Sequence, residues 1–157
     1  MPMKIGDAIP TFEGATEWLN ELQETADDYV KGAPTLVYFW ATSCGICKEN
    51  MPKLQELKNK YKAHGLKTVA IHLPRYEADT NLETVKETIE KHRIDDVCAI
   101  DNGHKLKDAF LNEQGWVPVY YLFDAEGKLK SRAAGEYGVG VLTTALDKMF
   151  ATKSATA

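Results

Sequence analysis

The chain has 157 residues, of which 44% are hydrophobic and 27% are charged, and its formal net charge is −4 at pH 7. This length and composition are typical of a globular protein, so we expect one domain over residues 1–157 with one compact core. Both signs of charge are mixed along the chain and leave no basic field for phosphates, which argues against nucleic acid as a partner. No apolar run reaches the roughly 18 residues of a membrane span.

The opening stretch MPMKIGDAIPTFEG has neither the basic n-region nor the apolar h-region of a signal peptide. We therefore expect a cytosolic protein; a native leader removed from the chain would instead place it outside the cytoplasm. Three cysteines are too few, and an odd number, for a disulfide scaffold. Each cysteine needs its own explanation.

The first predicted elements form a strand-helix-strand unit. TLVYFW (35–40) and TVAIHL (68–73) are short apolar runs, typical of strands buried on both faces of a parallel sheet. Between them, apolar spacings of three and four predict a helix that stops at Gly65. Residues 1–33 precede this unit as an N-terminal extension. The apolar face of the helix consists of Cys47, Met51, Leu54, Leu57 and Tyr61.

A second helix and a third strand are predicted next. Thr80 and Glu83 have capping-box spacing, which predicts the start of a helix that runs to about His92. VCAI (97–100) is typical of a buried strand, and HKLKDAFLN (104–112) of a short helix.

The last part of the chain predicts a hairpin and a helix. VYYLF (119–123) and LKSRAA (129–134) flank DAEGK, a connection with a glycine that is typical of a β-hairpin. The final residues ATKSATA (151–157) are expected to fray. The order of elements predicts a mixed sheet between layers of helices. The closing helix is marked by Leu142, Ala145, Leu146, Met149 and Phe150.

Cys44 and Cys47 stand where the first strand is expected to meet the helix. The free N–H groups and the positive end of the helix dipole at that place favour a thiolate, lowering the pKa of Cys44 from about 8.5 into a range of roughly 3.5 to 7.5. With solvent access as well, Cys44 is the expected nucleophile. Cys47 lies one turn later on the same face and would resolve the mixed disulfide. Gly45 leaves room for a polypeptide to approach Cys44.

Two other interpretations of this pair are open. A zinc site needs four ligands, but there is one C-x-x-C and the four histidines lack H-x3-5-H spacing. Two inert core cysteines are also possible, although a C-x-x-C at a strand-to-helix corner favours a redox pair. Cys98 lies in the centre of an apolar strand and is expected to be structural.

Three stretches carry a resemblance to a known family: FWATSCGICK, Pro52 in the following helix, and WVPVYYLFDAEGKL. Over residues 34–150 the chain resembles thioredoxin-fold thiol-disulfide oxidoreductases, and among them the redoxin or TlpA/ResA-like branch. The resemblance implies an α/β thioredoxin-like fold, with a central mixed sheet flanked by helices and a helical insertion after the first βαβ unit. It also implies that Cys44 attacks and Cys47 resolves.

The resemblance further implies a substrate-binding surface. Trp40 would floor the site, and Pro118 would be a cis-proline that faces the cysteines. A cis bond there would expose the N–H and C=O of Val117 to an extended substrate, which would pair with them as a short added strand. The alternative is that Pro118 merely opens a strand. Gly45 and Ile46, between the cysteines, complete the expected substrate-binding set.

Two departures from thioredoxins lie at the cysteines, where Ile46 replaces their proline and Ser43 their tryptophan. The redox potential therefore does not transfer from them.

The acid-base groups of these families also differ. Tyr38 stands at the place of the buried aspartate of thioredoxins, and Asn50 at the place of a glutamate in cytochrome-maturation relatives. Glu49 and His72 are candidate bases, but an exposed carboxylate and a structural histidine are their more ordinary roles.

We interpret the sequence as a cytosolic, monomeric dithiol-disulfide exchange enzyme that reduces disulfides in other proteins, with an upstream electron donor and without a cofactor or metal. One alternative is a peroxiredoxin-like thiol peroxidase, against which Thr42 stands two residues before Cys44 instead of three. The other is a redox-inactive interaction module, against which the intact C-x-x-C argues.

Overall fold

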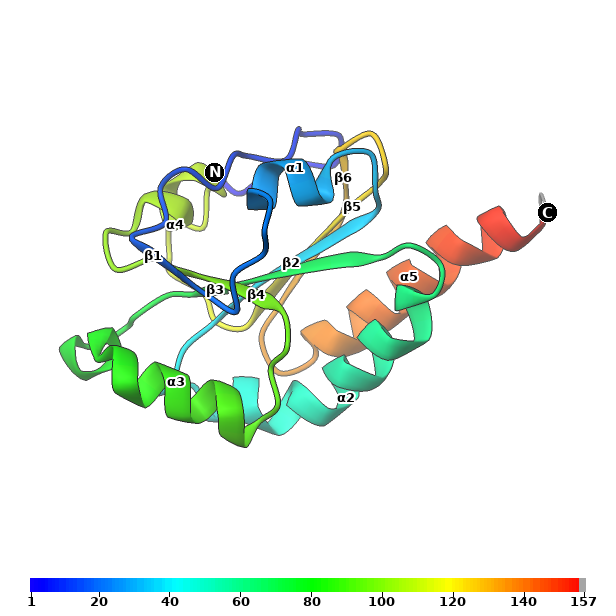
Figure 1. Cartoon of the computed structure of the whole chain (residues 1–157). Helices are drawn as coiled ribbons and strands as arrows, with labels where there is room; N and C mark the ends of the chain where they lie inside the picture. Colours follow the sequence, from blue (N-terminus) through cyan, green and yellow to red (C-terminus); the bar gives the residue numbers. More distant parts are fainter. Residues whose placement is uncertain (156–157) are drawn as a thin grey trace.

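The computed structural model describes the backbone of residues 1–155 and the side chains of residues 1–151. Six strands form one sheet in the order β1-β4-β3-β2-β5-β6. Helices α2, α3 and α5 lie on one side of this sheet and α1 and α4 on the other (Figure 1). The strands are β1 (Glu17–Leu19), β2 (Thr35–Trp40), β3 (Lys67–His72), β4 (Val97–Ile100), β5 (Val119–Phe123) and β6 (Leu129–Ala134). The helices are α1 (Ala26–Val30), α2 (Gly45–Lys62), the 3-10 helix η1 (Glu77–Thr80), α3 (Leu82–Lys91), α4 (Lys105–Ala109) and α5 (Gly138–Ala155).

The pairing confirms the predicted mixed sheet. β2 pairs in parallel with β3 and antiparallel with β5, β3 pairs in parallel with β4, and β5 and β6 form the predicted hairpin. β3 begins at Lys67 and ends at His72, one residue before the predicted boundary at each end. η1 and α3 follow the first βαβ unit, where the resemblance implied a helical insertion.

The sheet separates two apolar cores because successive side chains of a strand point to opposite faces. Tyr38 and Trp40 of β2 lie in the core under α2, α3 and α5, together with both site cysteines. Val37 and Phe39 lie in the core on the side of α1 and α4. All six residues of β2 are buried, which explains why its sequence is continuously apolar and does not alternate.

The predicted start of the helix after β3 was wrong by one residue. The N-cap of α3 is Asn81, not Thr80: the Asn81 side chain accepts hydrogen bonds from the N–H groups of Glu83 and Thr84, whereas Thr80 ends η1. An Asn cap satisfies the free N–H groups as well as a Thr cap does, so the spacing of Thr80 and Glu83 was not decisive.

The short helix α4 covers only part of the predicted 104–112 segment, because Phe110 ends it and Leu111 has a positive φ. The expected fraying from residue 151 is not seen over 151–155, where α5 continues. Residues 156 and 157 lie outside the described residues. Within residues 1–155, none of the helices is both long and apolar enough to cross a membrane.

The N-terminal extension carries structure that the sequence patterns did not indicate. β1 joins the edge of the sheet beside β4, and Phe12 and Val30 fill the core under α1. β1 has three residues and α1 five, so neither is long enough to show a periodic apolar pattern. Residues 1–33 are thus packed against the sheet.

Replacing Phe12 by alanine tests whether the extension is part of the core. The Phe12 side chain is 2% exposed, and its ring centroid lies 6.2 Å from that of Trp18 and 5.9 Å from that of Phe110. We expect Phe12→Ala to lower the free energy of unfolding by about 3 to 5 kcal/mol in urea titrations, since a buried aromatic leaves a cavity. Tyr137→Ala, at a side chain 81% exposed, is the control with an expected change within about 0.5 kcal/mol. Equal effects of the two variants would contradict this packing role.

Candidate active site

Cys44 and Cys47 form a disulfide at the start of α2, with their Cα atoms 5.3 Å apart. Cys44 is the N-cap residue, and its sulfur accepts a hydrogen bond of 3.1 Å from the N–H of Cys47. No acidic residue lies in the first turn of α2, so the positive end of the helix dipole at Cys44 is not opposed there. The predicted pair is thus a bonded pair at a helix N-terminus.

The exposure of Cys44 differs from the expectation. Both cysteines are only 3% exposed and belong to the core under α2. The bonded sulfurs pack against apolar side chains, whereas Ser43, Gly45 and Ile46 are exposed around them. In the disulfide form, solvent therefore reaches the backbone around Cys44 more readily than its side chain.

Trp40 and Cys98 lie inside the protein. Trp40 is 1% exposed, shares the core of the two cysteines and meets the ring of His72 edge-on, with centroids 4.8 Å apart. It supports the site from within, and a contact of Trp40 with substrate remains a prediction. Burial raises the pKa of the Cys98 thiol to about 12, which agrees with a structural role.

The Val117–Pro118 peptide bond is cis, as the resemblance implied. Val119 pairs with Phe39, so the loop before β5 lies beside the carboxyl end of β2 and the Cys44 corner. Val117 packs against the core that contains both cysteines. Among residues 1–151, neither the N–H nor the C=O of Val117 has a hydrogen-bond partner, which leaves both groups available.

Asn112 holds this proline loop, a role that the sequence patterns did not indicate. Its side chain is 1% exposed; it accepts a hydrogen bond from the N–H of Trp116 and donates one to the C=O of Trp116, both at 3.0 Å. A side-chain amide that matches both groups of one residue fixes that residue's backbone. The residue before Val117 is therefore held from inside the protein.

Asp79 holds the other side of the site and was also missed. Its carboxylate is 3% exposed and accepts hydrogen bonds from the hydroxyls of Thr42 at 2.9 Å and Ser43 at 2.7 Å. Burial by itself raises the pKa of Asp79, but these hydrogen bonds and those from the N–H groups of Arg75 and Tyr76 lower it below its ordinary value. A charged carboxylate thus lies beneath the two residues before Cys44.

The two candidate bases have different environments. His72 is fully buried at the end of β3, and its Nε2 accepts a hydrogen bond of 3.2 Å from the N–H of Thr42. Burial lowers the pKa of His72 to about 4, against a weaker opposite effect of Asp79, so the ring is neutral near pH 7. This favours the structural interpretation of His72. Glu49 is exposed on α2.

A second, largely buried carboxylate belongs to Asp96, the residue just before β4. Tyr38, which the resemblance places where thioredoxins have an aspartate, donates a hydrogen bond of 2.8 Å to Asp96, and Lys58 forms an ion pair with the same carboxylate. Burial raises the pKa of Asp96, while Lys58 opposes this effect.

Within the described residues, no group of three or more His, Cys, Asp or Glu side chains is arranged to hold a metal ion.

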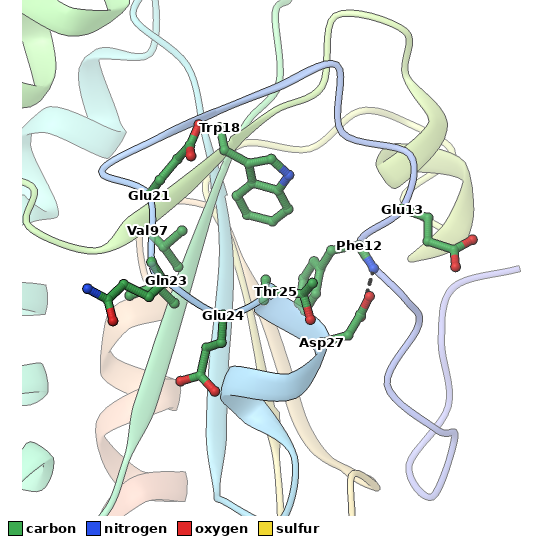
Figure 2. A pocket seen from close by; sticks show the side chains of 11 residues that line it. Phe12, Glu13, Trp18, Glu21, Gln23, Glu24, Thr25, Asp27 and Val97 are labelled. Carbon is green, nitrogen blue, oxygen red and sulfur yellow. Dashed lines mark hydrogen bonds between the residues drawn. The ribbon is translucent and has the colours of Figure 1, made fainter.

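A separate surface pocket of about 390 Å³ lies between the N-terminal segment and β4 (Figure 2). Phe12 and Trp18 form part of its wall, and Asp27, whose carboxylate accepts a hydrogen bond from the N–H of Phe12, lies at its rim. None of its lining residues belongs to the cysteine corner or the proline loop. The pocket is therefore not part of the thiol site.

The neutral, buried His72 makes stability depend on pH. Its pKa is about 4 in the folded chain and 6.5 in the unfolded one, so the unfolded state takes up a proton first as the pH falls. We expect the free energy of unfolding to fall by about 3 kcal/mol through this group between about pH 7 and about pH 4. His72→Gln, which keeps an acceptor but does not titrate, should show a smaller decrease in urea titrations. An identical pH dependence in both proteins would contradict this assignment.

Comparison with known proteins supports the same reading of the site. The family model described as Redoxin matches residues 4–146. The thiol-disulfide oxidoreductase YkuV of Bacillus subtilis is 38% identical over 149 residues, which cover 95% of this chain and 98% of that relative. The thiol-disulfide oxidoreductase ResA of Bacillus cereus is 31% identical over 134 residues, or 85% of this chain and 72% of that relative.

Among solved structures, the solution structure of a thioredoxin-like protein in the oxidised form has a TM-score of 0.81 and 39% sequence identity. The match covers 96% of this chain and 99% of that one. Together with the disulfide that caps α2, these similarities show that the chain belongs to the Redoxin family and is a thiol-disulfide oxidoreductase close to YkuV and ResA.

Proposed function

We propose that the Cys44–Cys47 pair reduces disulfides in partner proteins. In the reduced chain, the thiolate of Cys44 attacks one sulfur of the substrate and forms a mixed disulfide, and the other substrate sulfur leaves as a thiolate that takes up a proton. Cys47 then loses its proton and attacks Cys44, which closes the 44–47 disulfide and releases the second substrate thiol. An upstream dithiol donor restores the pair. The observation that carries this proposal is the disulfide at the N-cap of α2.

The positions of the two thiols on α2 indicate which one attacks the substrate. The sulfur of Cys44 is at the N-cap, where the N–H of Cys47 points at it and the helix dipole favours negative charge. Cys47 is inside the first turn and accepts no such hydrogen bond among the described residues. The thiolate is therefore better stabilised on Cys44, which supports its role as the attacking thiol.

The surface beside the pair suits an extended polypeptide. The unpaired N–H and C=O of Val117 can each form a hydrogen bond with a substrate backbone, as in the addition of a strand to a sheet edge. A Cβ atom at Gly45 would meet nothing within 4 Å in the protein, so the space over Gly45 is open to a substrate. Ile46, which is 38% exposed, offers an apolar contact.

The cytosolic location remains part of the proposal and is tested by cell fractionation.

Alkylation of the reduced protein tests the order of thiol reactivity. With limiting iodoacetamide near neutral pH, we expect Cys44 to react first, because only Cys44 lies at a helix N-terminus. Cys98 should react last, because burial raises its pKa to about 12. Peptide mass spectrometry over time would measure the three rates. Fastest labelling of Cys98 would overturn the structural role assigned to it.

Trapping separates an exchange enzyme from a docking module. In Cys47→Ser, Cys44 can still attack substrate disulfides, but nothing resolves the mixed disulfide, so covalent complexes should accumulate in a cytosolic extract and dissociate on reduction. Cys44→Ser is the matched control and should trap none. Equal yields from the two variants would favour a binding module or a reductant of small-molecule disulfides over protein disulfide exchange.

A further inference from the structure

The two residues before Cys44 are held by the end of β3 and the segment that follows it. Besides the hydroxyls that bind Asp79, the N–H of Thr42 donates to the Nε2 of His72. Thr42 and Ser43 are thus fixed through backbone and side chains by residues more than 25 positions away in the sequence. Since Cys44 follows directly, this network limits where its sulfur can lie.

Arg75 completes the network with a positive charge. Its Nη2 donates a hydrogen bond of 2.8 Å to the C=O of Ser43, and its Nε donates one of 3.3 Å to the hydroxyl of Ser43. Its own N–H donates to Asp79 at 2.9 Å. The C=O of Ser43 is bonded to the nitrogen of Cys44, so the guanidinium lies one hydrogen bond away from the peptide that carries the reactive sulfur.

Burying a carboxylate costs free energy unless hydrogen-bond donors occupy its lone pairs. The donors to Asp79 all belong to two short segments, Thr42–Ser43 and Arg75–Tyr76. Asp79 and Arg75 thus bring one negative and one positive charge into hydrogen-bond contact with Ser43. We propose that Asp79 and Arg75 are positioning residues for the exchange reaction, which rests on the function proposed above: they fix the Thr42–Ser43 peptide and balance the charge beside the sulfur of Cys44.

The charges of Asp79 and Arg75 act on the thiolate of Cys44 with opposite signs, so removing one or the other should shift the pKa of Cys44 in opposite directions. A purely structural role would not produce these opposite shifts. Arg75→Gln leaves the charge of Asp79 uncompensated, so the pKa of Cys44 should rise by about half a unit to one unit. The reduced form then loses stabilisation, and the pair becomes more reducing. Asp79→Asn leaves the positive charge, so the pKa of Cys44 should fall by a similar amount.

The experiment measures two quantities in the full chain and its variants. The pKa of Cys44 comes from the ultraviolet absorbance of the thiolate during a pH titration, and the equilibrium constant with glutathione comes from thiol quantification. We expect the equilibrium constant to change about threefold to tenfold, in opposite directions for Arg75→Gln and Asp79→Asn. Arg75→Lys, which keeps the charge, should restore most of the wild-type pKa. The double variant should lie between the two single variants.

Glu77→Gln is the matched control, because Glu77 is an exposed carboxylate on the same turn, two residues from Asp79. It should leave the pKa of Cys44 unchanged. Shifts in the same direction for both single variants, or none, would overturn the inference. Should Asp79→Asn fail to fold, Arg75→Gln and its reversal in Arg75→Lys decide the matter. A wild-type chain that exchanges no protein disulfides would refute the proposed function, while the pKa shifts would still test this inference.

Discussion

The burial of β2 in the middle of the sheet is the constraint on which the site depends. With β3 on one side and β5 on the other, its hydrogen-bonding groups are paired and its two faces are covered by apolar side chains. The antiparallel register with β5 brings the start of that strand to the carboxyl end of β2, and the parallel register with β3 brings His72 there. Three segments distant in sequence therefore meet where the chain turns into α2.

The loops that meet at the carboxyl end of β2 need further contacts to hold them, because the strand register fixes only the residues that it pairs. Here buried polar side chains supply it on both sides of the cysteines. Asp79 binds the segment before Cys44, and Asn112 binds the residue before Val117. Each is buried with its hydrogen-bonding groups occupied, which avoids the cost of an unpaired polar group and gives the two loops one low-energy arrangement.

The charges near Cys44 come from the start of α2 and from side chains of the segment after β3. His72 is kept neutral by burial, and the carboxylate of Asp79 is kept charged by its hydrogen-bond donors. Tyr38, at the place where the resemblance puts the aspartate of thioredoxins, donates a hydrogen bond to Asp96 just before β4, and Lys58 pairs with the same carboxylate. The N-terminus of α2 and the guanidinium of Arg75 both favour a thiolate on Cys44, whereas the carboxylate of Asp79 opposes it.

The sequence by itself determined β2, β4, β5 and α2 from their long or continuous apolar patterns, and β6 from the hairpin connection before it. It also determined the redox pair, because a strand followed by C-x-x-C at a helix start is a local signal. Asn81, β1 and α1 were missed or misassigned because several residues cap a helix equally well and very short elements have no measurable period. Only the tertiary structure brought Asp79, Arg75 and Asn112 to the site and buried the sulfur of Cys44. Those facts follow from contacts between residues far apart in the chain, and no local pattern encodes which polar side chain will meet which loop.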